Sequence, residues 1–500
     1  MMATVGRNIL ANVAGVGLGM AVFVAAVPVY LRLLGAEAYG LVGLFTMVMG
    51  ASAALDLGLG ATLNREVARL TARPRDDGDR RDVARTLEAG GWCVGVLVGA
   101  LFAAAVPAIA HRWLSFSALT PTDVRGALWL MAAALPAVMV RGLYLAGLNG
   151  LQRQALANLV QVGGTTIRAG ASVVALVLIA PTVTVFFAVQ VALLYVEALS
   201  AGVALRRALP ATARGGRVRP AALRSLVAFS LGVSGTMLLG FALASLDQVV
   251  LSALLPLAEF GYYTLAVAAA SAVGQLVQPI TTAVYPRFSQ LVERGDTRKL
   301  SEEYHFFSQL VAVLVLSLGG LLVAFPGDVL GLWTRNEAVA RAAALVLGLR
   351  AVGTVLNALM HVPHVLQLAF GWSSFGVRVN AIAFVIVAPA TVLLSRRWGG
   401  AGAAAAYVGL NAAALLLAMV GMHRRVLPGE LGRWYGRLLF PAVAVAAVAA
   451  ASRAAMPDAL GTFARLAWLA GTGALSAAVA LAAAGGVRRR VLAAAGQWRS

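Results

Sequence analysis

Residues 126–148 read GALWLMAAALPAVMVRGLYLAGL, and this stretch decides the fold class. It carries a single charged side chain, Arg141, in 23 residues. A bilayer core of about 30 Å is crossed by a helix of ~20 residues, so the stretch is long and apolar enough to span a membrane. Similar runs predict fourteen spans, at 9–31, 40–62, 88–110, 126–148, 157–180, 183–205, 226–254, 261–284, 306–325, 339–364, 377–394, 402–422, 438–456 and 466–486.

The composition of the whole chain agrees with this interpretation. Of the 500 residues, 60% are hydrophobic and 12% are charged, whereas soluble domains average about 45–50% and about 25%. These values exclude a set of soluble domains, and so apolar a chain does not stay disordered. We therefore expect an all-α integral membrane protein.

The basic residues report the orientation of the predicted helices. Lys and Arg total 40 against 20 acidic residues, which gives a net charge of +20. With the N-terminus inside, and with residues at the very ends of a span counted with the adjacent connection, 28 basic residues fall on the cytoplasmic connections and termini, nine fall outside and three lie deeper within spans. This bias predicts that both termini are cytoplasmic. Because the arginines are spread over alternate loops and do not form one face, nucleic acid is not an expected partner.

Two matches at one offset indicate an internal repeat. Tyr39-Gly40 aligns with Phe260-Gly261 at an offset of 221, and the same offset carries Gly150 onto Gly371. Six helices is an even number, so we expect two parallel six-helix bundles related by an axis along the membrane normal, followed by two extra helices. The predicted parts are an N-terminal bundle (1–207), a basic cytoplasmic linker (208–225), a C-terminal bundle (226–428) and an extra pair with a basic tail (429–500). The connection 64–87 is expected to be a charged cytoplasmic loop.

Polar residues at helical spacing predict a cavity inside the membrane. Three spans carry them at intervals of three and four residues, which places each set on one face of a helix. Interhelical hydrogen bonding would explain a lone Ser or Thr, but an intramembrane arginine normally faces protein or a water-filled cavity. The predicted cavity-lining residues are Arg141, Gln161, Arg168, Gln275, Gln278, Arg350 and Asn357.

Three acids also lie within the predicted spans. Asp56, Glu197 and Asp247 could couple transport to an ion gradient, or could neutralise the intramembrane arginines. We favour the structural role for Glu197 and leave both open for Asp247; Asp56 and Asp247 are the candidate ion-coupling residues. His361 and His364 lack a nearby carboxylate, so no metal site is expected, and no cofactor is expected because the chain carries no phosphate-binding or nucleophile motif.

Several short motifs follow one another along the chain: RLLGAEAYGL (32–41), LDLGLG (55–60), DQ (247–248), EFGYYTLA (259–266), YPRF (285–288) and LQLAFG (366–371). In this order and spacing they resemble the bacterial polysaccharide-biosynthesis flippases, a family in the superfamily that also contains lipid II flippases and multidrug and toxin extrusion antiporters. The resemblance implies a non-enzymatic transporter of the bacterial cytoplasmic membrane that moves an undecaprenyl-diphosphate-linked oligosaccharide to the outer leaflet by alternating access. It places Arg32 and Asp56 at motif positions, Arg32 as a further substrate-binding candidate. It also implies membrane lipids and a polysaccharide polymerase or other assembly proteins as partners.

Two other functions are compatible with a chain of this type. A drug or cation antiporter of the same fold would favour acids and aromatic residues over arginine in its cavity, because its substrates are cationic. A membrane glycosyltransferase or polysaccharide polymerase would need a catalytic acid or base on sizeable outer loops, and the predicted outer loops are short. The intramembrane arginines favour the flippase.

Overall fold

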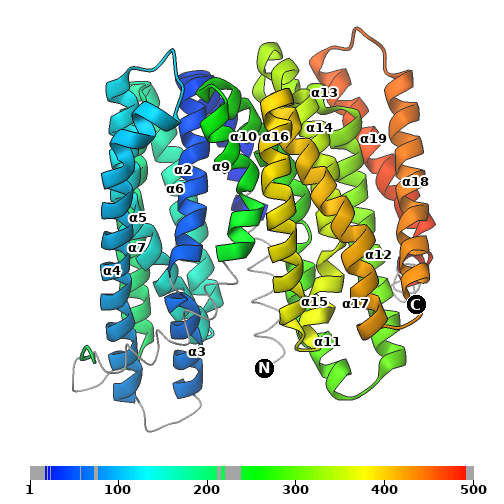
Figure 1. The fold of residues 1–500 in the computed structure, drawn as a ribbon, viewed down its shortest axis with the longest axis horizontal. Coiled ribbons are helices and arrows are strands. Elements are labelled where there is room, and N and C mark those ends of the chain that lie inside the picture. The colour runs from blue at the N-terminus through cyan, green and yellow to red at the C-terminus, as the bar shows by residue number, and fades with distance from the viewer. Residues whose placement is uncertain are drawn as a thin grey trace. The chain divides into compact units, whose positions relative to one another are not determined.

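The computed structural model describes residues 17–19, 21–22, 24–56, 58–71, 77–210, 216–219 and 238–490. Within these ranges the regular secondary structure is helical, and one isolated bridge pairs Ser115 with Pro256. The chain divides into two compact units, Met1–Gly261 and Tyr262–Ser500 (Figure 1). Some predicted features lie outside the described residues: the first span before residue 17, the linker at 211–215 and 220–225, the seventh span before residue 238, and the C-terminal tail after residue 490. The predicted domain boundaries stay a prediction.

The first unit is built from long apolar helices joined by short turns. After a helix over Gly17–Leu34, its helices are α2 (Ala36–Leu55), α3 (Leu59–Thr71), α4 (Asp77–Ala108), η1 (Ile109–Trp113), α5 (Pro121–Gly150), α6 (Gln154–Leu178), α7 (Val183–Ala208) and α9 (Leu246–Leu254). α5 is the central helix, because it packs against α2, α3, α4, α6 and α7. It contains the apolar stretch 126–148, and most of its side chains are buried.

The second unit has the same character. Its helices are α10 (Leu257–Gln275, which begins in the first unit), α11 (Gln278–Glu293), α12 (Thr297–Ala324), α13 (Pro326–Thr334), α14 (Glu337–Leu359), α15 (His361–Ala369), α16 (Ser373–Ala413), η2 (Ala414–Ala418), α17 (Met419–Val426), α18 (Leu431–Ala455) and α19 (Thr462–Ala483). Its core gathers large side chains, among them Trp434, Tyr304 and Phe288.

Among the described residues, eleven helices are long and apolar enough to cross a membrane. One of them, Ser373–Val426, contains the predicted spans 377–394 and 402–422, which are separated by a kink at Gly399. The predicted span 40–62 is represented by a shorter apolar helix, and the seventh is described only in part. Large apolar side chains face outward from these helices, for example Leu178, Val385 and Phe440 at 76%, 73% and 72% exposure. Such exposure is expected where lipid is the solvent, so the chain is a multi-pass membrane protein.

Three spans predicted as continuous helices are broken in the structure. The predicted span 40–62 breaks between α2 and α3, where Gly58 adopts a left-handed φ of 70°. The predicted spans 261–284 and 339–364 break between α10 and α11 and between α14 and α15. Both of these breaks precede a proline, Pro279 or Pro363, which cannot donate a backbone hydrogen bond to the preceding turn.

The predicted charged loop at 64–87 is wrong, because α3 continues to Thr71 and α4 starts at Asp77. Charged residues of the described parts lie on these helices and form local pairs, such as Arg69 with Glu66 (2.8 Å) and Arg85 with the following Glu88 (3.0 Å). Pairs three residues apart stabilise a helix, so a charged composition alone did not imply an irregular loop.

Helix starts in the two units repeat at a nearly constant spacing. Ala36 and Leu257 begin α2 and α10 at an offset of 221, and Leu59 and Gln278 begin α3 and α11 at an offset of 219. Asp77 with Thr297, and Gln154 with Ser373, start helices at offsets of 220 and 219. These four pairs of helix starts therefore repeat at a spacing of 219–221 residues, as the internal repeat predicts.

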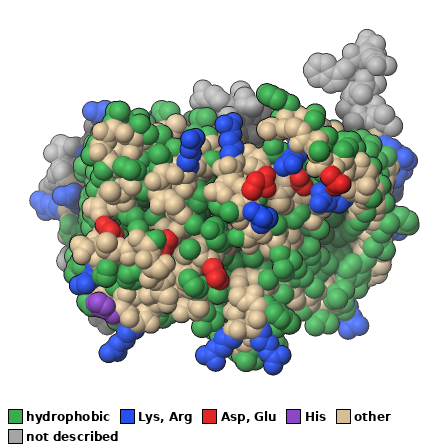
Figure 2. Space-filling model, turned by 90° about the horizontal axis from the view of Figure 1, so that it is seen from above, with side chains coloured by type: hydrophobic (Ala, Val, Ile, Leu, Met, Phe, Trp, Pro, Cys, Tyr) green, Lys and Arg blue, Asp and Glu red, His purple; other side chains and the backbone are tan. Residues whose placement is uncertain are grey.

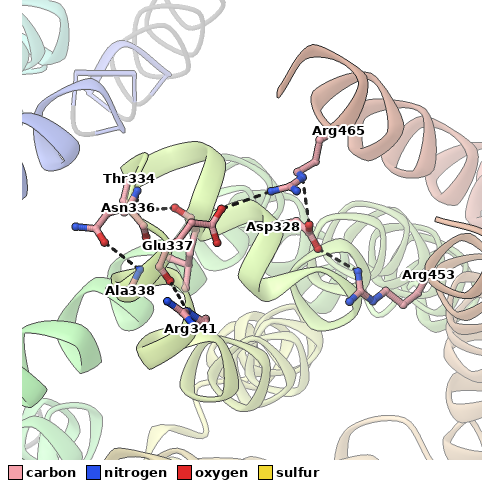
Figure 3. Close-up of polar contacts among 9 residues, drawn as sticks. Asp328, Thr334, Asn336, Glu337, Ala338, Arg341, Arg453 and Arg465 are labelled. Carbon is pink, nitrogen blue, oxygen red and sulfur yellow. Dashed lines mark hydrogen bonds and ion pairs between the residues drawn. The ribbon is translucent and has the colours of Figure 1, made fainter. Parts of the chain in front are cut away.

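The two extra helices belong to the second unit, where α18 and α19 pack against each other and against α12. Asp328 lies between two arginines of this pair, 3.2 Å from Arg453 and 3.5 Å from Arg465 (Figure 3). Arg465 also lies 3.8 Å from Glu337 at the start of α14. Figure 2 shows acidic and basic side chains side by side on this end of the molecule. Exposed pairs each contribute ~0–1 kcal/mol, so the cluster aligns the helix ends while apolar packing holds the pair.

Candidate functional site

The main candidate site is a cluster of three charged side chains on α5, α6 and α7. Arg141 on α5 donates to Oε1 of Glu197 at 2.8 Å, and Arg168 on α6 donates to Oε2 of the same carboxylate at 2.6 Å. The Glu197 side chain is 2% exposed, whereas those of Arg141 and Arg168 are 19% and 17% exposed. One carboxylate thus serves two guanidinium groups, and the cluster keeps one net positive charge.

The backbone of α6 makes room for this carboxylate. A Cβ added at Gly164 would lie 2.5 Å from the carboxyl carbon of Glu197. Glycine at this position therefore lets α7 bring Glu197 against α6, one turn before Arg168. A charge at the centre of a bilayer is unfavourable by at least ~2.5–3.5 kcal/mol, which explains why the acid is fully enclosed and doubly paired.

Hydrogen-bonding capacity remains in the cluster. The Nε of Arg141 is buried and has no hydrogen-bond partner within the part of the chain that the structure describes. A buried donor without a partner is costly, so this atom marks a place where a ligand acceptor would be favourable. Polar contacts continue along α6, where Gln190 donates to Ser172 at 3.1 Å and the Tyr30 hydroxyl donates to the Ala169 carbonyl at 3.1 Å.

The second unit carries its own polar face, between α14 and α16. The Arg350 guanidinium lies over the Tyr407 ring, 3.6 Å from the ring centroid, and Arg350 is 6% exposed. Two turns further along α14, Asn357 donates to Asn411 at 2.9 Å. An aromatic face attracts a guanidinium and replaces part of its hydration. Arg350 and Asn357 therefore both contact α16 through their side chains, and their role in lining a cavity stays a prediction.

The remaining predicted residues do not join either group. Arg32 is exposed near the end of the first helix, and Asp247 is buried in the first turn of α9. Gln161 and Gln278 are exposed and Gln275 is half-buried, and these three side chains form no hydrogen bond with the described residues. The break between α10 and α11 also separates Gln275 from Gln278, so the face predicted across them is not that of one helix.

Asp56 has a definite local role. Its carboxylate accepts from the backbone N–H groups of Gly58 at 2.7 Å and Gly60 at 3.2 Å. These contacts cap the start of α3 in the way that an N-cap aspartate does. The aspartate of the LDLGLG motif thus shapes the break between α2 and α3.

Glu37, which the sequence analysis did not single out, stabilises the turn before α5. Its buried carboxylate accepts from the backbone N–H groups of Ser117, Ala118 and Leu119 at 2.6, 2.5 and 2.8 Å. The signal available in the sequence was an acid between apolar residues inside the RLLGAEAYGL motif. Among the described residues, no group of three or more His, Cys, Asp or Glu side chains could hold a metal ion.

Comparison with known families identifies the chain. The model of the polysaccharide biosynthesis protein family matches residues 5–292, which is more than half of the sequence. The chain belongs to this family. The match covers α2 to α7 and therefore the whole Arg141–Glu197–Arg168 cluster. No curated protein matches the sequence.

Solved structures show the fold of this polysaccharide biosynthesis protein. The lipid II flippase MurJ in an inward closed conformation is similar with a TM-score of 0.72 at 10% identity, over 97% of this chain and 99% of that one. An inward-facing multidrug resistance MATE family transporter of the MOP superfamily is similar with a TM-score of 0.68 at 15% identity, over 83% of this chain and 96% of that one. A MOP superfamily transporter from Pyrococcus furiosus has a TM-score of 0.54 at 16% identity, over 85% and 96%. The fold is that of the MOP superfamily transporters.

Proposed function

We propose that the chain moves an undecaprenyl-diphosphate-linked oligosaccharide from the cytoplasmic to the outer leaflet by alternating access. The observation that carries this proposal is the net positive Arg141–Glu197–Arg168 cluster within membrane helices of a polysaccharide biosynthesis family protein. A pyrophosphate is the group on such a substrate that requires cationic partners. Guanidinium groups suit it, because their planar N–H donors match phosphate oxygens in pairs.

The geometry of the cluster fits this role. Glu197 fixes both arginines in place, so their remaining donors are positioned before a substrate arrives. The partial exposure of Arg141 and Arg168 leaves them accessible, and the unpartnered Nε of Arg141 offers one further donor. Because the carboxylate neutralises only one of the two cations, an anion placed beside them restores charge balance. A cationic drug placed there would add to the imbalance.

Further residues complete the proposed path. Arg32 and Arg350 provide additional positive charge, while amide side chains suit the hydroxyl groups of a glycan. These amides are Gln161, Gln275, Gln278 and Asn357. Asp56 and Asp247 are the proposed ion-coupling residues, if transport follows a proton or sodium gradient.

The proposed setting follows from the same chemistry. The protein lies in the bacterial cytoplasmic membrane with both termini inside, in contact with membrane lipids, and delivers its product to a polysaccharide polymerase or other assembly proteins. The positive-inside distribution of 28 basic residues against nine supports this orientation. Moving the substrate from one leaflet to the other leaves it chemically unchanged, so we propose no enzymatic step.

A deletion strain tests the proposal. Loss of surface polysaccharide, restored by the wild-type chain and not by Arg168→Ala, is the expected result. The variant Arg125→Ala is the matched control, because Arg125 lies near the start of α5, is exposed, and donates to the backbone carbonyl of Pro121 on its own helix. Unchanged polysaccharide together with increased sensitivity to cationic dyes would instead identify a drug antiporter and would refute the flippase proposal.

A further inference from the structure

A second cationic site lies away from the Arg141–Glu197–Arg168 cluster, where the first turns of α4 meet the last turns of α7. The structure has a cavity of about 310 Å³ there, lined by Arg81 and Arg85 from α4 and by Arg206 from α7. Tyr144 of α5 and Gly216 of the segment 216–219 form further walls. This volume is within the ~300–1,000 Å³ range of small-molecule sites.

The charges in this cavity are not balanced. Glu88, the one acid among the described residues of the lining, already accepts from Arg85 at 3.0 Å, from Arg206 at 3.0 Å and from the Tyr144 hydroxyl at 2.6 Å. Arg81 donates its Nε to the Pro210 carbonyl at 2.7 Å, and among the described residues it has no carboxylate partner. Three guanidinium groups against one carboxylate leave two net positive charges in the lining.

Two further acids of α4, Asp79 and Asp82, have partners in the segment 216–219. Asp82 accepts from the backbone N–H of Arg217 at 2.6 Å, and its second oxygen lies 2.6 Å from the Arg219 guanidinium. Asp79 lies 3.3 Å from the same guanidinium. These acids therefore hold the segment 216–219 against α4 and do not neutralise Arg81.

The wall formed by this segment is closely fitted. The backbone N–H of Arg219 donates to the Thr86 hydroxyl at 3.0 Å. A Cβ on Gly216 would lie 2.7 Å from the Arg81 carbonyl oxygen, so only glycine allows this approach. On the opposite side Leu205 and Leu209 add apolar lining. The cavity thus combines a cationic lining with an apolar wall, at an end of the unit that the positive-inside bias places in the cytoplasm.

We propose that this cavity binds a phosphate-bearing anion at the cytoplasmic surface, through Arg81, Arg85 and Arg206. Guanidinium forks bind phosphate oxygens in pairs, and basic pockets between helices on this side of a membrane suit lipid headgroups. The source of the phosphate is either the headgroup of an anionic phospholipid or free phosphate. The site is distinct from the proposed translocation site and does not depend on the proposed transport function.

Equilibrium binding to the purified full chain in neutral detergent tests the site. The probes are dioleoylphosphatidylglycerol, dioleoylphosphatidylcholine with the same acyl chains, and inorganic phosphate at constant ionic strength. We expect phosphatidylglycerol to bind more tightly than phosphatidylcholine. Arg81→Gln and Arg85→Gln are each expected to weaken the binding about tenfold, because each removes a charge-assisted hydrogen bond. Arg81→Lys should weaken it less, because it retains the charge, and Arg125→Gln should leave it unchanged.

The outcomes separate the two sources. Binding of phosphatidylglycerol that the arginine variants weaken supports a lipid headgroup, and binding of inorganic phosphate alone supports a free anion. Arg85→Gln keeps the test valid if Arg81→Gln does not fold, because Arg85 is exposed and, in the part of the chain that the structure describes, its ion pair is with Glu88 three residues away on the same helix. The proposal is wrong if neither anion binds, if the two lipids bind equally and inorganic phosphate does not bind, or if both glutamine variants bind the anion as the wild type does.

Discussion

Gly40 and Gly261 make reciprocal close contacts across the two copies of the repeated motif. A Cβ on Gly40 would collide with the backbone carbonyl of Leu257, and a Cβ on Gly261 would collide with the backbone carbonyl of Ala36. Leu257 is the counterpart of Ala36 at the same offset of 221 that relates the two glycines. Gly40 therefore packs against Leu257, and Gly261 packs against the equivalent residue, Ala36. Such a reciprocal pair of contacts is the pattern of a two-fold contact.

This relationship predicts that alanine at either glycine is destabilising. Gly40→Ala and Gly261→Ala each force a backbone shift, and overpacking of this kind is unfavourable by about 1–3 kcal/mol. Because the two collisions occur at one junction, the double variant should lose less stability than the sum of the single variants. Thermal unfolding of the purified chain measures the effect. Gly170→Ala is the control, since a Cβ there has no neighbour within 4 Å; equal midpoints for all variants would contradict the prediction.

The Arg141–Glu197–Arg168 cluster predicts loss of export when Arg168 is replaced and loss of stability when Glu197 is replaced. Arg168→Ala leaves one Arg–Glu pair, so the protein should fold but lose export of the lipid-linked substrate. Glu197→Ala leaves two guanidinium groups without a counter-charge, and removing one partner of a buried pair is unfavourable by about 3–5 kcal/mol. Surface polysaccharide reports export, and protein amount with the thermal midpoint reports folding. Wild-type export by Arg168→Ala would refute the cationic site, and an unchanged midpoint for Glu197→Ala would refute its structural role.

Much of this cluster could be predicted from the sequence, and the parts that could not be predicted have a physical reason. The depth and phase of Arg141 and Arg168 followed from their positions in apolar spans, and pairing with an arginine was the favoured one of two possible roles for Glu197. Spacing alone could not show that one carboxylate bonds both arginines, because that depends on the approach of α7 to α6 at Gly164. It also could not show the break at Asp56, where hydrophobicity continues across a turn that a side-chain cap and a left-handed glycine create.

The second-unit site predicts a selective role for Arg350. Arg350→Ala should abolish export while the protein remains folded, because the charge is lost but the apolar packing of α14 on α16 remains. Tyr407→Phe keeps the aromatic face under the guanidinium and should retain export. Tyr407→Leu removes the cation–π contact, worth about 2 kcal/mol when desolvated, and should reduce stability and export together. Export by Arg350→Ala at the wild-type rate would exclude this residue from the substrate path.

Replacement of Asp247 distinguishes a role in ion coupling from a structural role for this residue. It lies in the first turn of α9, and Asp247→Asn removes the charge with little change in shape. We expect the variant to fold and to lose the dependence of flipping on an imposed proton or sodium gradient. Flux of a labelled lipid-linked oligosaccharide in vesicles, with and without each gradient, measures this. Wild-type flux that ignores both gradients would exclude ion coupling altogether.

Glu430 predicts how stability changes with pH at the start of α18. Its carboxylate contacts Nε2 of His305 at 2.8 Å, and this contact joins the start of α18 to α12. Both carboxylate oxygens also lie 3.0 Å from the Arg433 guanidinium on α18. Burial alone would raise the pKa of Glu430, but hydrogen bonds from His305 and Ser301 and the charge of Arg433 lower it below the ordinary 4.5. A carboxyl whose pKa is lower in the folded state stabilises the fold above its unfolded pKa and loses that contribution as the pH falls through the folded pKa.

Glu430→Gln should therefore unfold at a lower temperature than the wild type at neutral pH. The gap between the two midpoints should close as the pH falls below 4.5, because the wild-type carboxyl then takes up its proton. Thermal unfolding in detergent from neutral pH to below pH 4 measures the gap. Glu302→Gln is the control, since Glu302 forms an exposed pair with Arg298 within one helix, and such pairs contribute little. A gap that stays constant with pH would show that the amide perturbs packing and that the charge of Glu430 does not stabilise the fold.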